Sequence, residues 1–330
     1  MTQYRHRLPL TGTMPFLTDG GLETTLVFHD GIELPYFAAF DLLKSDDGFA
    51  RLARYYDGYA ELAQTRGAGF VLETPTWRAS ADWAKRLGYD AAGLADANRR
   101  SVGLMLEVRE RFETPFAAFV ISGNLGPRGD GYRADRRMSA DEAQRYHSAQ
   151  IETFEQTAAD LVTAVTLNYV DEAIGIVRAA RDAKMPVVVS FTTETDGTLP
   201  AGDSLADAIT RTDDATDGYA AYYMVNCAHP THFEPVLRRG GPFASRLRGV
   251  RANSSKRSHA ELDASTDLDA GNPEELADEY ATLRTLLPNL LVYGGCCGTD
   301  LRHLRAISDR ALPPHRAPAR RAPARRAPAA

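Results

Sequence analysis

Apolar residues follow two patterns along the chain, short continuous runs and longer stretches in which they recur at helical spacing. The runs predict strands at residues 14–21, 69–76, 115–126, 160–168, 185–194, 218–227, 246–253 and 289–297. The helical spacing predicts helices at 46–67, 80–112, 138–159, 171–183, 203–211, 231–238 and 273–286. Ser139 stands three residues before Glu142 in a capping-box pattern. The interval 254–272 shows neither pattern and is predicted to be a loop.

Strands and helices therefore alternate, and no Gly/Pro-rich linker divides the chain into halves. Eight strands with mostly helical crossovers predict the α/β fold class, as a single (β/α)₈ TIM barrel. An open doubly wound sheet would more often show fewer strands, with a phosphate loop after the first. We expect the barrel domain to span residues 1–312. The Pro/Ala/Arg-rich segment 313–330 cannot bury a core and is expected to be a disordered tail.

In such a barrel the chemistry lies at the carboxyl ends of the strands. The predicted ends carry a set of polar, glycine and cysteine residues: Asp19, Gly20, Gly21, Glu73, the "GNLGPRGDGY" loop at 123–132, Thr166, Glu194, Asn226, Cys227, Cys296 and Cys297. All three cysteines of the chain belong to this set. The sequence therefore predicts that the thiols meet at one end of the barrel.

Three thiolates from two strand ends can bind Zn²⁺ and leave its fourth tetrahedral position open, the arrangement of a catalytic site. A thiol substrate at the open position would lose its proton near neutral pH and become a nucleophile for alkyl transfer. Adjacent cysteines also occur as plain buried residues or as a vicinal disulfide, and the residue types leave these alternatives open. His229, two residues after Cys227, is a second candidate ligand, although a surface position is the simpler interpretation.

Composition and charge narrow the function classes. Three cysteines are too few for a disulfide framework and favour a reducing compartment. No signal peptide and no membrane span is recognisable, so we expect a cytoplasmic protein without a membrane partner. Five arginines lie in the tail, and residues 1–315 carry 33 basic and 44 acidic groups, a balance of −11. A body this acidic argues against nucleic-acid binding.

Five segments in chain order resemble one family: "TDGGLETTL" (18–26), "GNLGPRGDGY" (123–132), "VSFTTETDGTLPAGDSL" (189–205), "VNCAHP" (225–230) and "GGCCGTD" (294–300). They are similar to the homocysteine S-methyltransferase family. This family includes betaine–homocysteine and S-methylmethionine-dependent methyltransferases, and the homocysteine module of cobalamin-dependent methionine synthase. The resemblance runs from about residue 14 to 310.

The resemblance implies a (β/α)₈ barrel with zinc held by Cys227, Cys296 and Cys297. Homocysteine and a sulfonium or quaternary ammonium methyl donor would be the small-molecule partners, and methionine the product. Asp19 matches the aspartate of the family's "DGG" motif, which implies a contact with the substrate ammonium. The amides around Gly20 and Gly21 are implied to receive the substrate carboxylate.

One position departs from the family pattern. Relatives commonly end the fourth strand with Glu-Thr, whose glutamate also binds the ammonium, whereas Val165 stands here. Either Glu73 or Glu194 takes over this contact, or the acceptor is another small thiol, a selenol or a corrinoid-linked system. A non-catalytic zinc-binding barrel is a further alternative. Trp77 could face a cationic donor by a cation–π contact, but we favour a core position for it.

Overall fold

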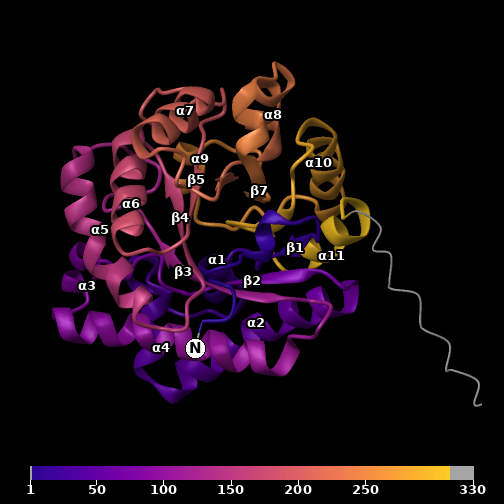
Figure 1. Cartoon of the computed structure of the whole chain (residues 1–330). Helices are drawn as coiled ribbons and strands as arrows, with labels where there is room; N and C mark the ends of the chain where they lie inside the picture. Colours follow the sequence, from indigo (N-terminus) through magenta and orange to yellow (C-terminus); the bar gives the residue numbers. More distant parts are fainter. Residues whose placement is uncertain (1, 313–330) are drawn as a thin grey trace, which may run out of the picture.

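The computed structural model describes residues 2–312. Eight parallel strands close into a barrel in chain order, with β8 paired to β1 (Figure 1). The strands are β1 (Phe16–Leu17), β2 (Gly69–Glu73), β3 (Phe119–Leu125), β4 (Leu161–Leu167), β5 (Val187–Phe191), β6 (Tyr222–Asn226), β7 (Leu247–Ala252) and β8 (Val292–Gly295). Every predicted strand is present, and the (β/α)₈ barrel is confirmed. The tail prediction for 313–330 lies outside the described residues.

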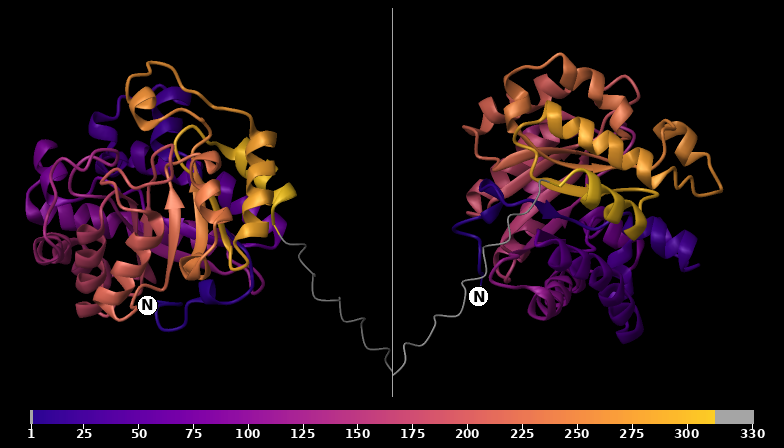
Figure 2. Two further views of the ribbon diagram at one scale, coloured as in Figure 1. Left: turned by 90° about the horizontal axis from the view of Figure 1, so that it is seen from above. Right: turned by 90° about the vertical axis from the view of Figure 1, so that its right-hand side faces the viewer.

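Helices surround the strands on the outside of the barrel (Figures 1 and 2). The α-helices are α1 (Leu22–Thr24), α2 (Asp46–Arg66), α3 (Ala81–Arg86), α4 (Ala91–Phe112), α5 (Ala140–Glu155), α6 (Val170–Asp182), α7 (Leu205–Thr216), α8 (Pro230–Arg238), α9 (His259–Asp263), α10 (Pro273–Leu286) and α11 (Leu301–Arg310). Short η elements are η1 (Pro9–Thr11), η2 (Thr25–His29), η3 (Pro35–Phe37), η4 (Ala39–Lys44) and η5 (Pro242–Arg246). The capping box between Ser139 and Glu142 starts α5 as predicted. The predicted loop 254–272 contains the short helix α9, and α11 was not predicted.

The amino end of the barrel is closed by apolar side chains. Residues near the strand starts, among them Phe16, Leu161 and Tyr222, form a buried cluster against which Tyr4 and Leu8 of the N-terminal segment pack. Burying these side chains removes apolar surface from water, which is the main stabilising contribution to such a layer. The carboxyl end is therefore left as the open end of the barrel.

A buried ion pair holds the N-terminal segment in place. The Asp160 carboxylate accepts hydrogen bonds from the backbone amides of Gln3 (2.9 Å) and Tyr4 (2.8 Å). Its second oxygen pairs with the buried Arg109 guanidinium at 2.9 Å. Each carboxylate oxygen thus has a partner, as a charge in this environment requires.

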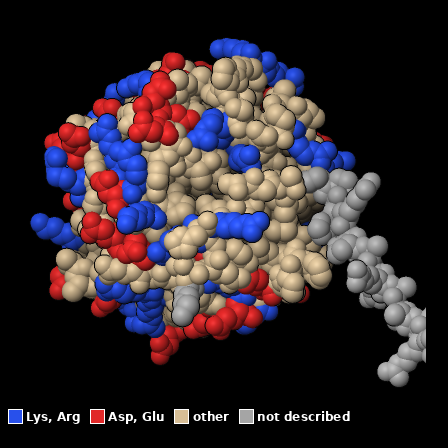
Figure 3. All heavy atoms as spheres, in the orientation of Figure 1, with Lys and Arg blue, Asp and Glu red and all other residues tan. Residues whose placement is uncertain are grey.

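None of the helices in residues 2–312 combines the length and the apolar character needed to cross a membrane. On the face shown in Figure 3, acidic and basic side chains are interspersed, and a few basic side chains lie within the mostly uncharged centre. This face therefore carries no extended surface of a single charge sign.

Candidate active site

A cavity of about 550 Å³ lies at the carboxyl ends of the strands. Seven strands contribute a lining residue at or within two residues of their last position: Asp19, Glu73, Asn124, Thr166, Cys227, Arg251 and Cys296. The loop that follows β3 adds Asp130, Gly131 and Tyr132. The predicted location of the chemistry is therefore occupied by a substantial cavity.

The three cysteines meet on the wall of this cavity. Their Sγ atoms all lie within 4.8 Å of one another, with 2.6 Å between Cys227 and Cys296 and 3.6 Å between Cys227 and Cys297. All three are free cysteines, so the alternative of a vicinal disulfide is not realised. Three sulfur ligands converging from two strand ends are the donor set of a metal site with an open position.

The backbone at Cys227 is strained and firmly held. Its φ of 55° lies in the left-handed region, which costs a non-glycine residue about 1–3 kcal/mol. The Cys227 carbonyl accepts hydrogen bonds from Asn253 Nδ2 (3.0 Å) and Thr192 Oγ1 (3.3 Å), and lies 2.8 Å from His259 Nε2. These contacts offset the strain and fix the direction in which the sulfur points.

The two cysteines after β8 depend on a close turn. Gly298 has φ of 79°, and a Cβ at this position would collide with the Ser254 hydroxyl. Only glycine combines this dihedral with so close an approach. The Ser254 amide donates to the Cys297 carbonyl at 3.1 Å, and the Cys296 amide donates to the Ala252 carbonyl at 2.8 Å. The glycine after the cysteine pair thus sets the positions of both sulfurs.

The three thiols differ in their pKa. Hydrogen bonds from Cys227 and then Cys297, with Arg251 nearby, lower the pKa of Cys296 well below that of an ordinary thiol. The hydrogen bond with Cys296 raises the pKa of Cys227, and hydrogen bonds with Cys227 and then Cys296 raise the pKa of Cys297. The cluster therefore accommodates negative charge on sulfur, which is the form that binds a metal ion. In its donor set and its charge the cluster fits a metal ion.

Asp19 lies in the cavity wall but already has partners within the chain. Its carboxylate is 3% exposed, pairs with Arg251 Nη2 at 2.8 Å and accepts a hydrogen bond from the Tyr55 hydroxyl at 3.2 Å. Burial raises the pKa of Asp19, and the Arg251 charge opposes that rise. Nothing in the sequence pointed to Arg251 in this role, because an arginine within a strand usually indicates an exposed edge.

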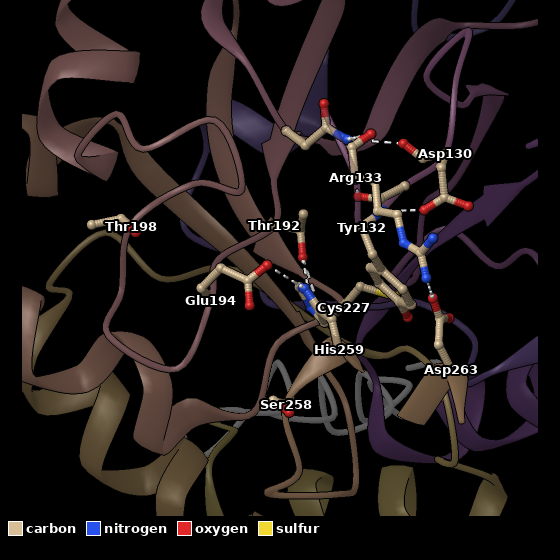
Figure 4. Close-up of polar contacts among 12 residues, drawn as sticks. Asp130, Tyr132, Arg133, Thr192, Glu194, Thr198, Cys227, Ser258, His259 and Asp263 are labelled. Carbon is tan, nitrogen blue, oxygen red and sulfur yellow. Dashed lines mark hydrogen bonds and ion pairs between the residues drawn. The ribbon is translucent and has the colours of Figure 1, made fainter. Parts of the chain in front are cut away.

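Tyr132 and His259 are further residues whose role the sequence did not predict. The Tyr132 hydroxyl lies 3.4 Å from Cys227 Sγ and 3.6 Å from Cys297 Sγ. The His259 ring stacks on the Tyr132 ring with centroids 4.0 Å apart (Figure 4). Tyr132 is the last residue of the "GNLGPRGDGY" segment at 123–132. His259 lies in the interval 254–272, where no sequence pattern distinguishes it.

A sequence profile described as Homocysteine S-methyltransferase matches residues 16–311. The chain belongs to the homocysteine S-methyltransferase family. No protein of curated function matches it significantly by sequence.

Crystal structures of one homocysteine methyltransferase have the same fold. The metallated form of MmuM from Escherichia coli is 21% identical, with a TM-score of 0.73 over 92% of this chain and 99% of that one. The oxidized form is 22% identical, with a TM-score of 0.71 over 90% and 96%. At this identity the likeness supports the barrel fold alone.

The family's second acid has two candidate replacements, and their positions differ. Val165 lines the cavity, as expected at the family's glutamate position. Glu73 also lines it, is 3% exposed, and has no hydrogen-bond partner for Oε2 among residues 2–312. Burial raises the pKa of Glu73 from 4.5 to about 7, against the opposing charge of Arg251. Glu194 is instead directed to His259 Nδ1 at 3.3 Å (Figure 4) and is absent from the lining residues.

Three expectations need correction. Trp77 is only half-buried and lines the cavity, so a core position for it is wrong. His229 is buried instead of lying on the surface. Its ring caps the amino end of α8 by accepting a hydrogen bond from the Thr231 amide, and it is not part of the cysteine cluster. The Gly21 amide donates to the Thr299 carbonyl at 3.0 Å and is not free to receive a substrate carboxylate.

Proposed function

We propose that this protein is a zinc-dependent methyltransferase that moves a methyl group from a sulfonium or quaternary ammonium donor to the thiol of homocysteine, giving methionine. The observation that carries the proposal is the convergence of Cys227, Cys296 and Cys297 on the cavity wall. Membership of the family supports homocysteine as the acceptor.

The donor set supports zinc as the cofactor. Three thiolates would hold the ion and leave one position for a substrate sulfur. A relative of the same fold was solved in a metallated form, which agrees with this assignment. When bound, zinc would supply Lewis acidity that keeps the acceptor sulfur deprotonated near neutral pH. The chain's own residues then have to bind and orient the two substrates.

The charges around the cavity support an amino-acid acceptor. Two buried carboxylates, Asp19 and Glu73, share a single buried guanidinium, that of Arg251. An ammonium group between the carboxylates would balance the second negative charge and give Glu73 Oε2 a donor. We therefore propose Asp19 and Glu73 as the ammonium contacts, with Glu73 in place of the glutamate that Val165 replaces.

The transfer itself is a displacement at the methyl carbon. A bond forms between the acceptor sulfur and this carbon, and the bond from the carbon to the donor's sulfur or nitrogen breaks. The electron pair of the broken bond stays on the donor, which leaves as a neutral sulfide or amine, and the thiol proton passes to solvent. The cavity's task is to align the two heteroatoms with the carbon between them.

Metal analysis tests the site. The full-length protein, purified under reducing conditions, should contain about one zinc per chain, because three thiolates and one open position make one site. Cys227→Ser, Cys296→Ser and Cys297→Ser should each lose most of the zinc. Tyr132→Phe is the matched control, since it removes the hydroxyl next to the sulfurs but no thiol, and it should keep the metal. Full zinc content in the serine variants would refute the assignment.

A substrate panel tests the reaction. Homocysteine and other small thiols and selenols are assayed with S-methylmethionine, glycine betaine and S-adenosylmethionine as onium donors, and in a separate arm with a methylated corrinoid protein. Methionine formation with one of these donors is the expected result. Turnover only with another thiol or selenol would identify a different acceptor, and transfer only with a methylated corrinoid protein would identify a corrinoid-linked system. Zinc binding without turnover of any pair would indicate a non-catalytic barrel.

A further inference from the structure

The cavity contains a second polar site, formed by residues that follow β2. The guanidinium of Arg78 lies between two indole rings, with Cζ 3.8 Å from the Trp77 ring centroid and 3.9 Å from that of Trp83. All three residues line the cavity. On the outer side Arg86 lies over the same Trp83 ring at 4.4 Å. We call Trp77, Arg78 and Trp83 the arginine stack.

The inner end of the arginine stack lies close to the sulfur cluster. A Cβ on Gly131 would be 3.2 Å from Trp77 Cζ2 and 2.9 Å from Thr166 Cγ2, so the indole edge lies against the residue that precedes Tyr132. The Tyr132 hydroxyl in turn contacts the sulfurs of Cys227 and Cys297. A Cβ on Gly126 would collide with Trp77, so close packing explains the glycine at this position of the "GNLGPRGDGY" loop.

Arg78 has no direct ion-pair partner among residues 2–312. It is 6% exposed, and within these residues its side chain makes one hydrogen bond, from Nη1 to the Gly129 carbonyl at 3.0 Å. No carboxylate in residues 2–312 lies within 4.0 Å of it, although Asp130 and Glu23 influence it from farther away. Burial lowers the pKa of Arg78 to about 10, so the group stays charged at neutral pH. A buried charge without a direct ion-pair partner is costly and favours an anionic ligand.

Unpartnered N–H groups of the arginine stack also favour an anionic ligand. Arg78 Nε, Trp77 Nε1 and Trp83 Nε1 are buried and have no hydrogen-bond partner among residues 2–312. Arginine and the indole nitrogen can only donate hydrogen bonds. The site therefore has donors in excess, and a planar carboxylate is the group that a guanidinium binds best.

We propose that the arginine stack binds a carboxylate of the methyl donor, so that the donor is an onium compound carrying its own carboxylate. This proposal rests on the proposed function, which makes a methyl donor one of the two substrates. The thiol and the ammonium of the acceptor are already assigned to the sulfurs and to the acids Asp19 and Glu73. Because Arg78 fills the space between the two indoles, they offer no free aromatic cage, and a cation alone would be repelled. A carboxylate attached to that cation orients it, with the methyl group inward and the anion on Arg78.

The protein carries its own reporter for this site. Trp77 and Trp83 are the chain's two tryptophans, so tryptophan fluorescence arises wholly from the stack. The full-length protein is titrated with glycine betaine, dimethylsulfoniopropionate and S-methylmethionine, and with choline and trimethylsulfonium as cations without a carboxylate. At least one carboxylate-bearing compound should change the fluorescence saturably and bind roughly ten- to a hundredfold more tightly than the matched cation, the range expected for a charge-assisted hydrogen bond.

Three variants assign the effect to Arg78. Arg78→Met should abolish the preference for the carboxylate, and Arg78→Lys, which keeps the charge but loses the planar fork, should retain part of it. Arg100→Met is the matched control, because Arg100 lies over the Phe49 ring outside the cavity, and it should retain the full preference. If Arg78→Met does not fold, the wild-type comparison and Arg78→Lys still decide the question.

Several outcomes would overturn the proposal. They are equal binding of betaine and choline, absence of any saturable response to the carboxylate compounds, and an unchanged preference in Arg78→Met. A fourth arm titrates homocysteine and 3-mercaptopropylamine, which lacks the carboxylate. If Arg78→Met weakens only homocysteine, the bound anion belongs to the acceptor and the donor assignment is wrong. Because the readout is binding, failure of the proposed methyl transfer would appear separately, as carboxylate-selective binding without turnover.

Discussion

Replacing Glu73 by glutamine tests whether Glu73 makes the ammonium contact that the glutamate at position 165 makes in relatives. The amide in the Glu73→Gln variant would keep the shape of the side chain but not its negative charge. The hydrogen bond from the substrate ammonium would then lose its charge assistance. A hydrogen bond to a charged group contributes about 1.5–3 kcal/mol. Glu73→Gln should therefore lower kcat/KM for homocysteine by roughly ten- to a hundredfold. The loss for 4-mercaptobutyrate, which has no amino group, should be much smaller.

The pH dependence provides a second readout of the same residue. The pKa of Glu73 is raised to about 7 by burial, and the ammonium requires the ionised carboxylate. The ratio of kcat/KM for homocysteine to that for 4-mercaptobutyrate should rise as pH increases through this value, since kcat/KM reports the ionisations of the free enzyme. The ratio cancels the titration of the sulfur that both thiols share. In Glu73→Gln it should be flat.

The free energy of unfolding of the wild type should fall with rising pH, whereas the selectivity for homocysteine rises. The pKa of Glu73 is higher in the folded protein, at about 7, than the 4.5 of an ordinary glutamate, so the folded state binds more protons between these values. The wild type therefore loses stability as pH rises from 4.5 to 7, by roughly 3 kcal/mol at most. Glu73→Gln should melt at a higher temperature than the wild type at pH 8, and the advantage should shrink toward pH 4.5.

The matched control is Glu194→Gln, which removes the same charge from a carboxylate that points to His259. Any effect of this change should be equal for the two thiols. Equal losses for both thiols in Glu73→Gln, or a selective loss in Glu194→Gln, would refute the assignment of the ammonium contact to Glu73.

Three further predictions concern the buried charges and the position of the family's second acid. Asp19→Asn should raise the KM for homocysteine more than that for 4-mercaptobutyrate, by about 1.5–3 kcal/mol in kcat/KM, and leave the zinc content unchanged; equal effects would mean that Asp19 does not contact the ammonium. Arg109→Met leaves the Asp160 carboxylate buried without its partner, so it should destabilise the protein by roughly 3–5 kcal/mol in urea unfolding, and an unchanged midpoint would contradict this. Adding Val165→Glu to Glu73→Gln should restore part of the selectivity for homocysteine, whereas a further loss would show that the two positions do not serve the same group.

The periodicity of the chain predicted the barrel because most strands are short, largely apolar runs buried on both faces. The same rule placed the cysteines, since a strand's end is visible in the sequence and all ends meet at one mouth. Arg251 was missed because its role depends on the side chain of Asp19, 232 positions away. His259 was missed for a similar reason, because its partner Tyr132 lies in a different loop. The arginine stack lies within residues 77–83, but no local pattern indicates that Arg78 is placed between the two indoles.

The arrangement of charge around the barrel suggests why an apolar residue can be tolerated at position 165. Going around the barrel, β6 and β8 lead to the cysteines, β7 carries Arg251, and β1 and β2 lead to the two acids. The charges of the barrel wall therefore lie on one side, while the ends of β3 and β4 contribute Asn124, Val165 and Thr166. An onium donor loses its positive charge as the methyl group leaves, so a wall without carboxylates stabilises the charged ground state less than an acidic wall would. On the proposed assignment of Glu73 to the acceptor ammonium, Val165 would keep an acid away from the proposed path of the methyl group.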